Sequence, residues 1–160
     1  MLDWLEQTDY SAIIRESSWG WPLALTVHAF GMAVVVSIMF IMTLRLFGRF
    51  RTIPYGWLGK LIPLVWIGVA CQIVSGASLL MAKPKQYLGD TVFESKLALL
   101  AGALAVTWTF HATLKREVAG WDATGSVSTR GLQLVCAAAL LWAAVTLTGR
   151  LTAYLGSLYL

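Results

Sequence analysis

Two histidines, His28 and His111, are the residues of this chain whose chemistry stands out, because each lies inside a long apolar stretch. His28 belongs to PLALTVHAFGMAVVVSIMFIMTLRLF, residues 22–47, and His111 to LALLAGALAVTWTFHATL. An ionisable side chain at membrane depth is unfavourable unless it faces protein, water or a bound group. Imidazole can ligate a metal, move a proton or hydrogen-bond to a neighbouring helix. His28 is therefore the first candidate for a functional site.

Several roles for His28 are open. Its ring could bond to Gln72, to a serine or to a backbone carbonyl, it could ligate haem, or it could form a proton or quinone site. Gly31 beside it would leave room for a flat ring, although glycine also permits close helix packing. Lys96, at the start of a later apolar stretch, would lie on the same side of the membrane as His28.

His111 lies near the other end of its stretch, close to Lys115, where a solvated or headgroup-bound histidine is the simpler interpretation. The helix rise places His28 and His111 roughly 15–20 Å apart along the membrane normal, on opposite sides of the midplane. Two imidazoles on one iron must lie about 4 Å apart, since metal–nitrogen bonds are near 2 Å. The two histidines of one chain therefore cannot hold one haem.

A haem site could still form in two ways. A symmetric dimer would bring His28 against His28 of a second copy, and His111 against its own counterpart. Alternatively, His28 would ligate haem with a second ligand from a partner or with none. Met32 lies one turn away on the same helix, which is the wrong geometry for the opposite axial position.

Composition determines the elements that must position these residues. The chain has 160 residues, of which 58% are hydrophobic and 12% charged, and its mean hydropathy is +0.72. Soluble chains carry about 25% charged residues, so the solvent for this surface is lipid. Spans of about 20 residues account for the whole length. We predict one domain, an all-α integral membrane four-helix bundle.

The predicted spans are residues 22–47, 61–82, 93–114 and 131–149. Residues 1–20 are acidic and amphipathic, so one or two short interfacial helices are expected there rather than a cleavable signal. Residues 117–129 are polar and contain glycine, which predicts a solvated connection. Arg45 ends the first span in LRLFGR and is interpreted as an interfacial anchor, with a propionate or headgroup clamp as the alternative.

The distribution of Lys and Arg predicts the orientation. Seven cations lie in or beside the first and third loops, and five lie on the other side. The prediction is a bacterial inner membrane protein with both termini in the periplasm. The first set is Arg45, Arg49, Arg51, Lys60, Lys115, Arg116 and Arg130, and the second is Arg15, Lys83, Lys85, Lys96 and Arg150.

Several functional classes lack their motifs. The sequence contains no GxSxG, GxGxxG, P-loop or HExxH motif, which argues against a stand-alone hydrolase or transferase. No carboxylates pair within the spans, and no basic cluster with interleaved aromatics suggests nucleic-acid binding. Cys71 and Cys136 form no CxxC or CxxCH motif, which argues against covalent haem attachment.

The stretches ESSWGWPLALTVHAFGMAVVVSIMFIMTLRLFG and LIPLVWIGVACQIVSGASLLMAKPKQYLGDTVFESKLALL resemble a group of small bacterial inner-membrane proteins with a domain of unknown function. The resemblance covers roughly residues 15 to 115. It also extends, more distantly and in architecture only, to four-helix b-type cytochromes and copper-resistance membrane proteins. In that group an acidic residue often precedes the arginine motif. In this chain Thr43 occupies that position. The matching positions are Pro22, His28, Gly31, Arg45, Phe93 and Lys96.

These observations lead to one first hypothesis. The chain would be an electron-transfer or anchor subunit that binds b-type haem through His28 and exchanges electrons with a quinone or a periplasmic partner. Such a subunit could belong to an oxidoreductase, and we expect a homo-oligomer or a larger membrane complex. The alternatives are a haem-free scaffold subunit and a small transporter.

Overall fold

The structure is a computed structural model that describes residues 3–155. Its described residues form helices and no strands, which confirms the predicted all-α bundle. Four helices are long and apolar enough to cross a membrane, as expected of a multi-pass membrane protein. The elements are α1 (Asp3–Glu6), α2 (Asp9–Glu16), α3 (Gly20–Leu46), α4 (Gly56–Ala82), α5 (Pro84–Tyr87), α6 (Thr91–Thr124) and α7 (Thr129–Leu155).

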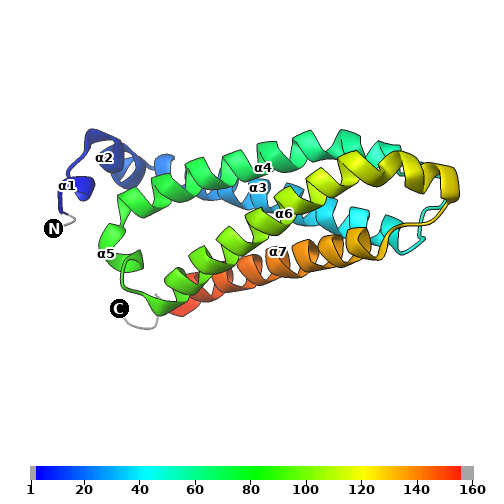
Figure 1. Ribbon diagram of the computed structural model, residues 1–160. Helices are drawn as coiled ribbons and strands as arrows, with labels where there is room; N and C mark the ends of the chain where they lie inside the picture. Colours follow the sequence, from blue (N-terminus) through cyan, green and yellow to red (C-terminus); the bar gives the residue numbers. More distant parts are fainter. Residues whose placement is uncertain (1–2, 156–160) are drawn as a thin grey trace.

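The four long helices form two hairpins, α3–α4 and α6–α7 (Figure 1). The main contact between the hairpins joins α3 to α7, and α4 touches α6 less extensively. Helices α1, α2 and α5 lie at one end of the bundle, which we call the α5 end. The α3–α4 and α6–α7 loops lie at the other end, which we call the loop end (Figure 1).

Small residues bring α3 and α4 into close contact. A Cβ atom on Gly31 would lie 2.8 Å from the carbonyl oxygen of Gly68, and one on Gly68 would lie 2.8 Å from a methyl group of Val35. Neither position has space for a larger residue. Backbones that approach this closely pack well without a hydrophobic driving force, as membrane helix pairs require.

Helix α6 is longer than the sequence predicted. It continues through residues 117–124, which were expected to be a solvated connection, and ends at Gly125 with a left-handed φ of 68°. Trp121 explains the extension, because its ring is buried between Tyr55 and the backbone at Gly131. An apolar ring that packs against two other segments stabilises helix beyond the apolar span.

The polar contacts of two side chains, Asp122 and Arg45, stabilise the loop end. The carboxylate of Asp122 accepts hydrogen bonds from the backbone N–H groups of Tyr55 and Gly56, at 2.7 and 2.9 Å, and so caps α4 from outside its own hairpin. Arg45 is 6% exposed, stacks 3.8 Å from the ring centroid of Tyr55, and donates from Nε to the carbonyl of Ile53. These contacts hold the α3–α4 loop against the end of α6.

At the α5 end the predicted short N-terminal helices are present and pack against α4. The hydroxyl of Tyr10 donates to Ser78, and that of Ser11 donates to the carbonyl of Met81. Tyr87 in α5 packs on Phe93 with ring centroids 5.4 Å apart. Burial raises the pKa of the Tyr87 hydroxyl above its ordinary value.

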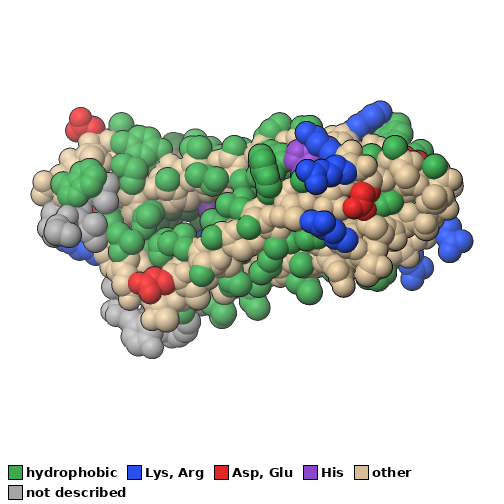
Figure 2. All heavy atoms as spheres, in the orientation of Figure 1, with side chains coloured by type: hydrophobic (Ala, Val, Ile, Leu, Met, Phe, Trp, Pro, Cys, Tyr) green, Lys and Arg blue, Asp and Glu red, His purple; other side chains and the backbone are tan. Residues whose placement is uncertain are grey.

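Side-chain types divide along the bundle. Figure 2 shows hydrophobic side chains along its whole length and most of the visible Lys and Arg side chains toward the loop end. Aliphatic and aromatic side chains such as Phe30, Phe40, Trp108 and Leu140 are more than half exposed on the outer surface of the helices. Such a surface is compatible with contact with lipid.

Candidate functional site

A cavity of about 730 Å³ separates the two hairpins toward the α5 end. Its volume lies within the roughly 300–1,000 Å³ range of small-molecule and cofactor sites. Nine residues of α3 line one side, Lys96 of α6 and the segment Thr146–Arg150 of α7 contribute the other, and most of the lining is apolar. Figure 2 shows the molecule hollowed between α4 and α6 on this half of the bundle.

His28 lines this cavity from α3, and its imidazole ring is hydrogen-bonded to α4. Nδ1 of His28 lies 3.0 Å from the hydroxyl oxygen of Ser75. That hydroxyl donates its own hydrogen to the carbonyl of Cys71 one turn earlier. It therefore accepts from His28, and Nδ1 is the nitrogen that bears the proton. The absence of a side chain at Gly76 leaves space for the ring, because a Cβ there would lie 3.3 Å from Cε1 of His28.

The second nitrogen of His28, Nε2, is left as a lone-pair donor. Among the residues that the structure describes, none forms a hydrogen bond with Nε2. Nε2 is also not one of the fully buried polar atoms without a partner in that part of the chain. A histidine that donates from one nitrogen to the protein and keeps the other free has the arrangement usual for metal-ligating imidazole. The geometry is therefore suited to binding iron or accepting a proton at Nε2.

Two cations line the same cavity as His28. Lys96 comes from the second turn of α6, and Arg150 comes from the C-terminal part of α7. The placement of Lys96 near His28 agrees with the sequence-based expectation. A Cβ on Gly149 would lie 3.5 Å from Nζ of Lys96, so the lysine chain runs along α7 at that glycine.

His111 lies away from the cavity. Its Nδ1 accepts a hydrogen bond of 3.3 Å from the indole nitrogen of Trp66 on α4. Ser75 and Trp66, the α4 partners of the two histidines, are nine residues apart, which corresponds to roughly 14 Å of helix rise. His111 and His28 therefore occupy separate sites, and His111 sits in an aromatic group with Trp66 and Trp108.

Two other residues predicted to bind a cofactor also lie outside the cavity lining. Gly31 is at the crossing of α3 with α4, where Gly68 occupies the space beside it. Arg45 is at the loop end, 17 residues and roughly 25 Å of helix from His28. Their positions support helix packing and loop anchoring, and give no support to a part in cofactor binding.

Nε2 of Gln72 is a buried polar atom without a hydrogen-bond partner in the described part of the chain. The residue as a whole is 7% exposed. The His28 ring bonds to the hydroxyl of Ser75 at 3.0 Å and also interacts with the backbone of Gln72, whereas the Gln72 side chain forms no hydrogen bond with it among the described residues. The Gln72 side chain packs beside Gly31, with its Cγ 3.3 Å from where a Cβ would lie.

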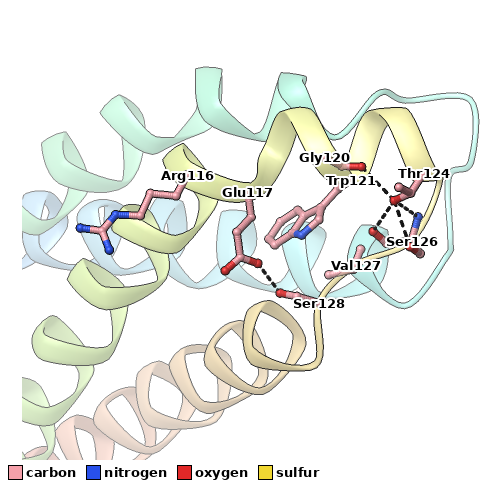
Figure 3. Close-up of a pocket in the computed structure, with 8 residues that line it drawn as sticks. All are labelled: Arg116, Glu117, Gly120, Trp121, Thr124, Ser126, Val127 and Ser128. Atoms are coloured by element: carbon pink, nitrogen blue, oxygen red, sulfur yellow. Dashed lines mark hydrogen bonds between the residues drawn. The ribbon is translucent and has the colours of Figure 1, made fainter.

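A second, shallower pocket of about 390 Å³ lies at the α6–α7 turn (Figure 3). There Glu117 accepts a hydrogen bond from Ser128, and Thr124 bonds to Ser126. Figure 3 shows Arg116 pointing away from this group. These contacts tie the turn together, and the pocket holds no histidine, cysteine or paired carboxylates among its lining residues.

Sequence reasoning missed Arg150 as a cavity residue and Ser75 as the specific partner of His28. Arg150 was counted only for membrane orientation, although its place on the same membrane side as Lys96 was a usable signal. Ser75 was not singled out among the serines that could bond to His28. Which serine meets His28 depends on the rotation of α3 relative to α4, which no residue pattern specifies.

Comparison with known proteins finds no matching family model, curated protein or solved structure. Fold and cavity nevertheless define a class: a multi-pass helical membrane protein with an imidazole and two cations around one cavity between its hairpins. The resemblance to small bacterial inner-membrane proteins stays a prediction.

Proposed function

We propose that this chain is a membrane subunit that binds b-type haem through Nε2 of His28. The observation that carries the proposal is the His28–Ser75 hydrogen bond of 3.0 Å, which assigns the proton to Nδ1 and leaves Nε2 as the lone-pair nitrogen of a side chain that lines a largely apolar cavity. A neutral imidazole held in this way is a suitable axial ligand.

The residues around the cavity fit such a group. Apolar side chains of α3 suit the flat porphyrin, and Lys96 and Arg150 suit its acidic substituents. Met32 is the other lining residue with a sulfur or imidazole ligand, and it lies on the same helix one turn from His28. The chain would therefore hold the iron through one residue, His28, with a second protein ligand from a partner copy or with none.

Bound haem would supply one-electron chemistry, which the apolar walls would insulate from competing reactions. We propose exchange of electrons with a quinone or a periplasmic partner, in a bacterial inner membrane, with the α5 end toward the periplasm. The excess of Lys and Arg at the loop end supports this orientation. A homo-oligomer or larger complex would complete the electron path.

The test is an absorption spectrum of detergent-purified protein from haem-replete cells. The proposal predicts a Soret band and a b-type α-band in the wild type and in His111→Ala, and their loss in His28→Ala. His111→Ala is the matched control, because it removes the other intramembrane imidazole. Size-exclusion chromatography of His28→Ala checks that the variant is folded. A folded but colourless wild type, or a spectrum that survives loss of His28, would refute the proposal.

A haem-free scaffold subunit is the second candidate. The observation in its favour is that the hydrogen bond to Ser75 also satisfies Nδ1 of a histidine that only packs between helices. This alternative predicts colourless protein that co-purifies with a second polypeptide, and a loss of thermal stability in His28→Ala without any spectral change.

A further inference from the structure

Lys96 and Arg150 bring two positive charges to the cavity, and the described part of the chain places no carboxylate beside them. The cavity lining, as far as residues 3–155 form it, contains no Asp or Glu. Among the described residues neither cation forms an ion pair, whereas Arg15 pairs with Glu16 and Lys85 with Glu6. An unpaired ammonium in a partly buried, apolar setting is unfavourable, so a counter-charge from outside the chain would be stabilising.

Lys96 is positioned to meet such a counter-charge inside the cavity. Its side chain is partly buried and lies along α7, with Cε and Nζ each 3.5 Å from where a Cβ on Gly149 would be. Arg150 follows Gly149 directly and lines the same cavity. The two cations therefore line one cavity from different helices, Lys96 partly buried and Arg150 exposed, at the α5 end of a chamber whose remaining lining is mostly apolar.

We infer that Lys96 and Arg150 bind the acidic group, a carboxylate or a phosphate, of an amphiphile whose apolar body occupies the cavity along α3. Charged donors form strong hydrogen bonds with either group, and α3 side chains such as Leu25, Phe30 and Val36 suit the apolar body. Haem with its propionates is one such ligand, and in that case the inference rests on the proposed function. An anionic lipid is the other source of the same chemistry.

The first arm of the test titrates the purified full-length protein with haemin and with haemin dimethyl ester, whose carboxylates are blocked. The expected result is that Lys96→Gln weakens haemin binding about tenfold and leaves binding of the ester unchanged, because one charge-assisted contact is lost. Lys96→Arg should restore haemin binding. Lys115→Gln on the same helix, exposed near the loop end, is the matched control and should behave as the wild type.

The second arm uses native mass spectrometry of the protein released from nanodiscs that contain phosphatidylcholine with a minor share of phosphatidylglycerol. An anionic lipid in the cavity predicts phosphatidylglycerol retained by the wild type and by Lys96→Arg, and lost from a Lys96→Gln, Arg150→Gln double variant.

The outcomes separate the two proposals. Haemin binding that depends on His28 but not on Lys96, with no charge-dependent lipid retention, overturns this inference and leaves the proposed function standing. Lipid retention that depends on Lys96, in a protein that binds no haemin, supports the inference and refutes haem binding. Equal behaviour of the wild type and the Gln variants in both arms overturns the inference.

Discussion

Nδ1 of His28 on α3 and the hydroxyl oxygen of Ser75 on α4 lie 3.0 Å apart, and the Ser75 proton is already donated to the carbonyl of Cys71. This pair joins the two helices of the first hairpin and determines which imidazole nitrogen is free. Ser75→Ala removes the acceptor and should weaken haemin binding about 10- to 100-fold, as loss of such a partner does at metal sites. A haemin titration followed at the Soret band measures it.

Ser78→Ala is the matched control for that experiment. Ser78 lies on the same helix close to Ser75, but its hydroxyl bonds to Tyr10 rather than to a histidine. Its loss should leave haemin affinity within error of the wild type. Equal haemin affinity of Ser75→Ala and the wild type would show that Nδ1 needs no fixed acceptor. It would also remove the main support for the site.

Asp122 caps α4 across the two hairpins, and its loss should destabilise the loop end. In Asp122→Ala the N–H groups of Tyr55 and Gly56 lose their acceptors, with an expected cost of about 1 kcal/mol in the free energy of unfolding. Asp122→Asn keeps one acceptor oxygen and should lose less. Unfolding by denaturing detergent, followed by circular dichroism, gives the order wild type, Asn, Ala. An equal stability of all three would show that water replaces the cap.

Gly31 and Gly102 make a contrasting pair of helical glycines. A Cβ on Gly31 would meet the Gly68 carbonyl at 2.8 Å, so Gly31→Ala must push α3 from α4, at a cost of about 1–3 kcal/mol. A Cβ on Gly102 meets nothing within 4 Å, so Gly102→Ala should be neutral or slightly stabilising through helix propensity. Thermal unfolding in one detergent compares them. A neutral Gly31→Ala would mean that the helices are not packed this closely.

Trp142 and Thr107 form a buried hydrogen bond between α7 and α6, with the indole nitrogen donating to the hydroxyl at 3.0 Å. Both side chains are fully buried. Trp142→Phe or Thr107→Val alone leaves a buried polar group unpaired, at a cost of about 1–3 kcal/mol. The double variant leaves neither the indole nitrogen nor the hydroxyl unpaired, so its loss of stability should be smaller than the sum of the two single losses. Strict additivity in this double-mutant cycle would show that the pair is not coupled.

The sequence determined the number and type of the long elements. Uninterrupted apolar stretches of about 20 residues predict helices in lipid, because only a helix pairs its own backbone groups there. Amphipathicity likewise predicted the short N-terminal helices, which the structure contains. Sequence-based prediction failed for residues 117–124, because a polar segment can stay helical when Trp121 packs against another hairpin.

For the candidate site, the sequence alone determined that an imidazole lies within a membrane span and that Lys96 shares its side. The tertiary structure decided the rest: that Ser75 binds His28, that Gly31 packs against α4, that Arg45 anchors a loop, and that Arg150 joins Lys96 at the cavity. The physical reason is that depth follows from counting residues along one helix. Contact follows from the rotation of each helix about its axis and from its neighbours, which arise only when the whole bundle packs.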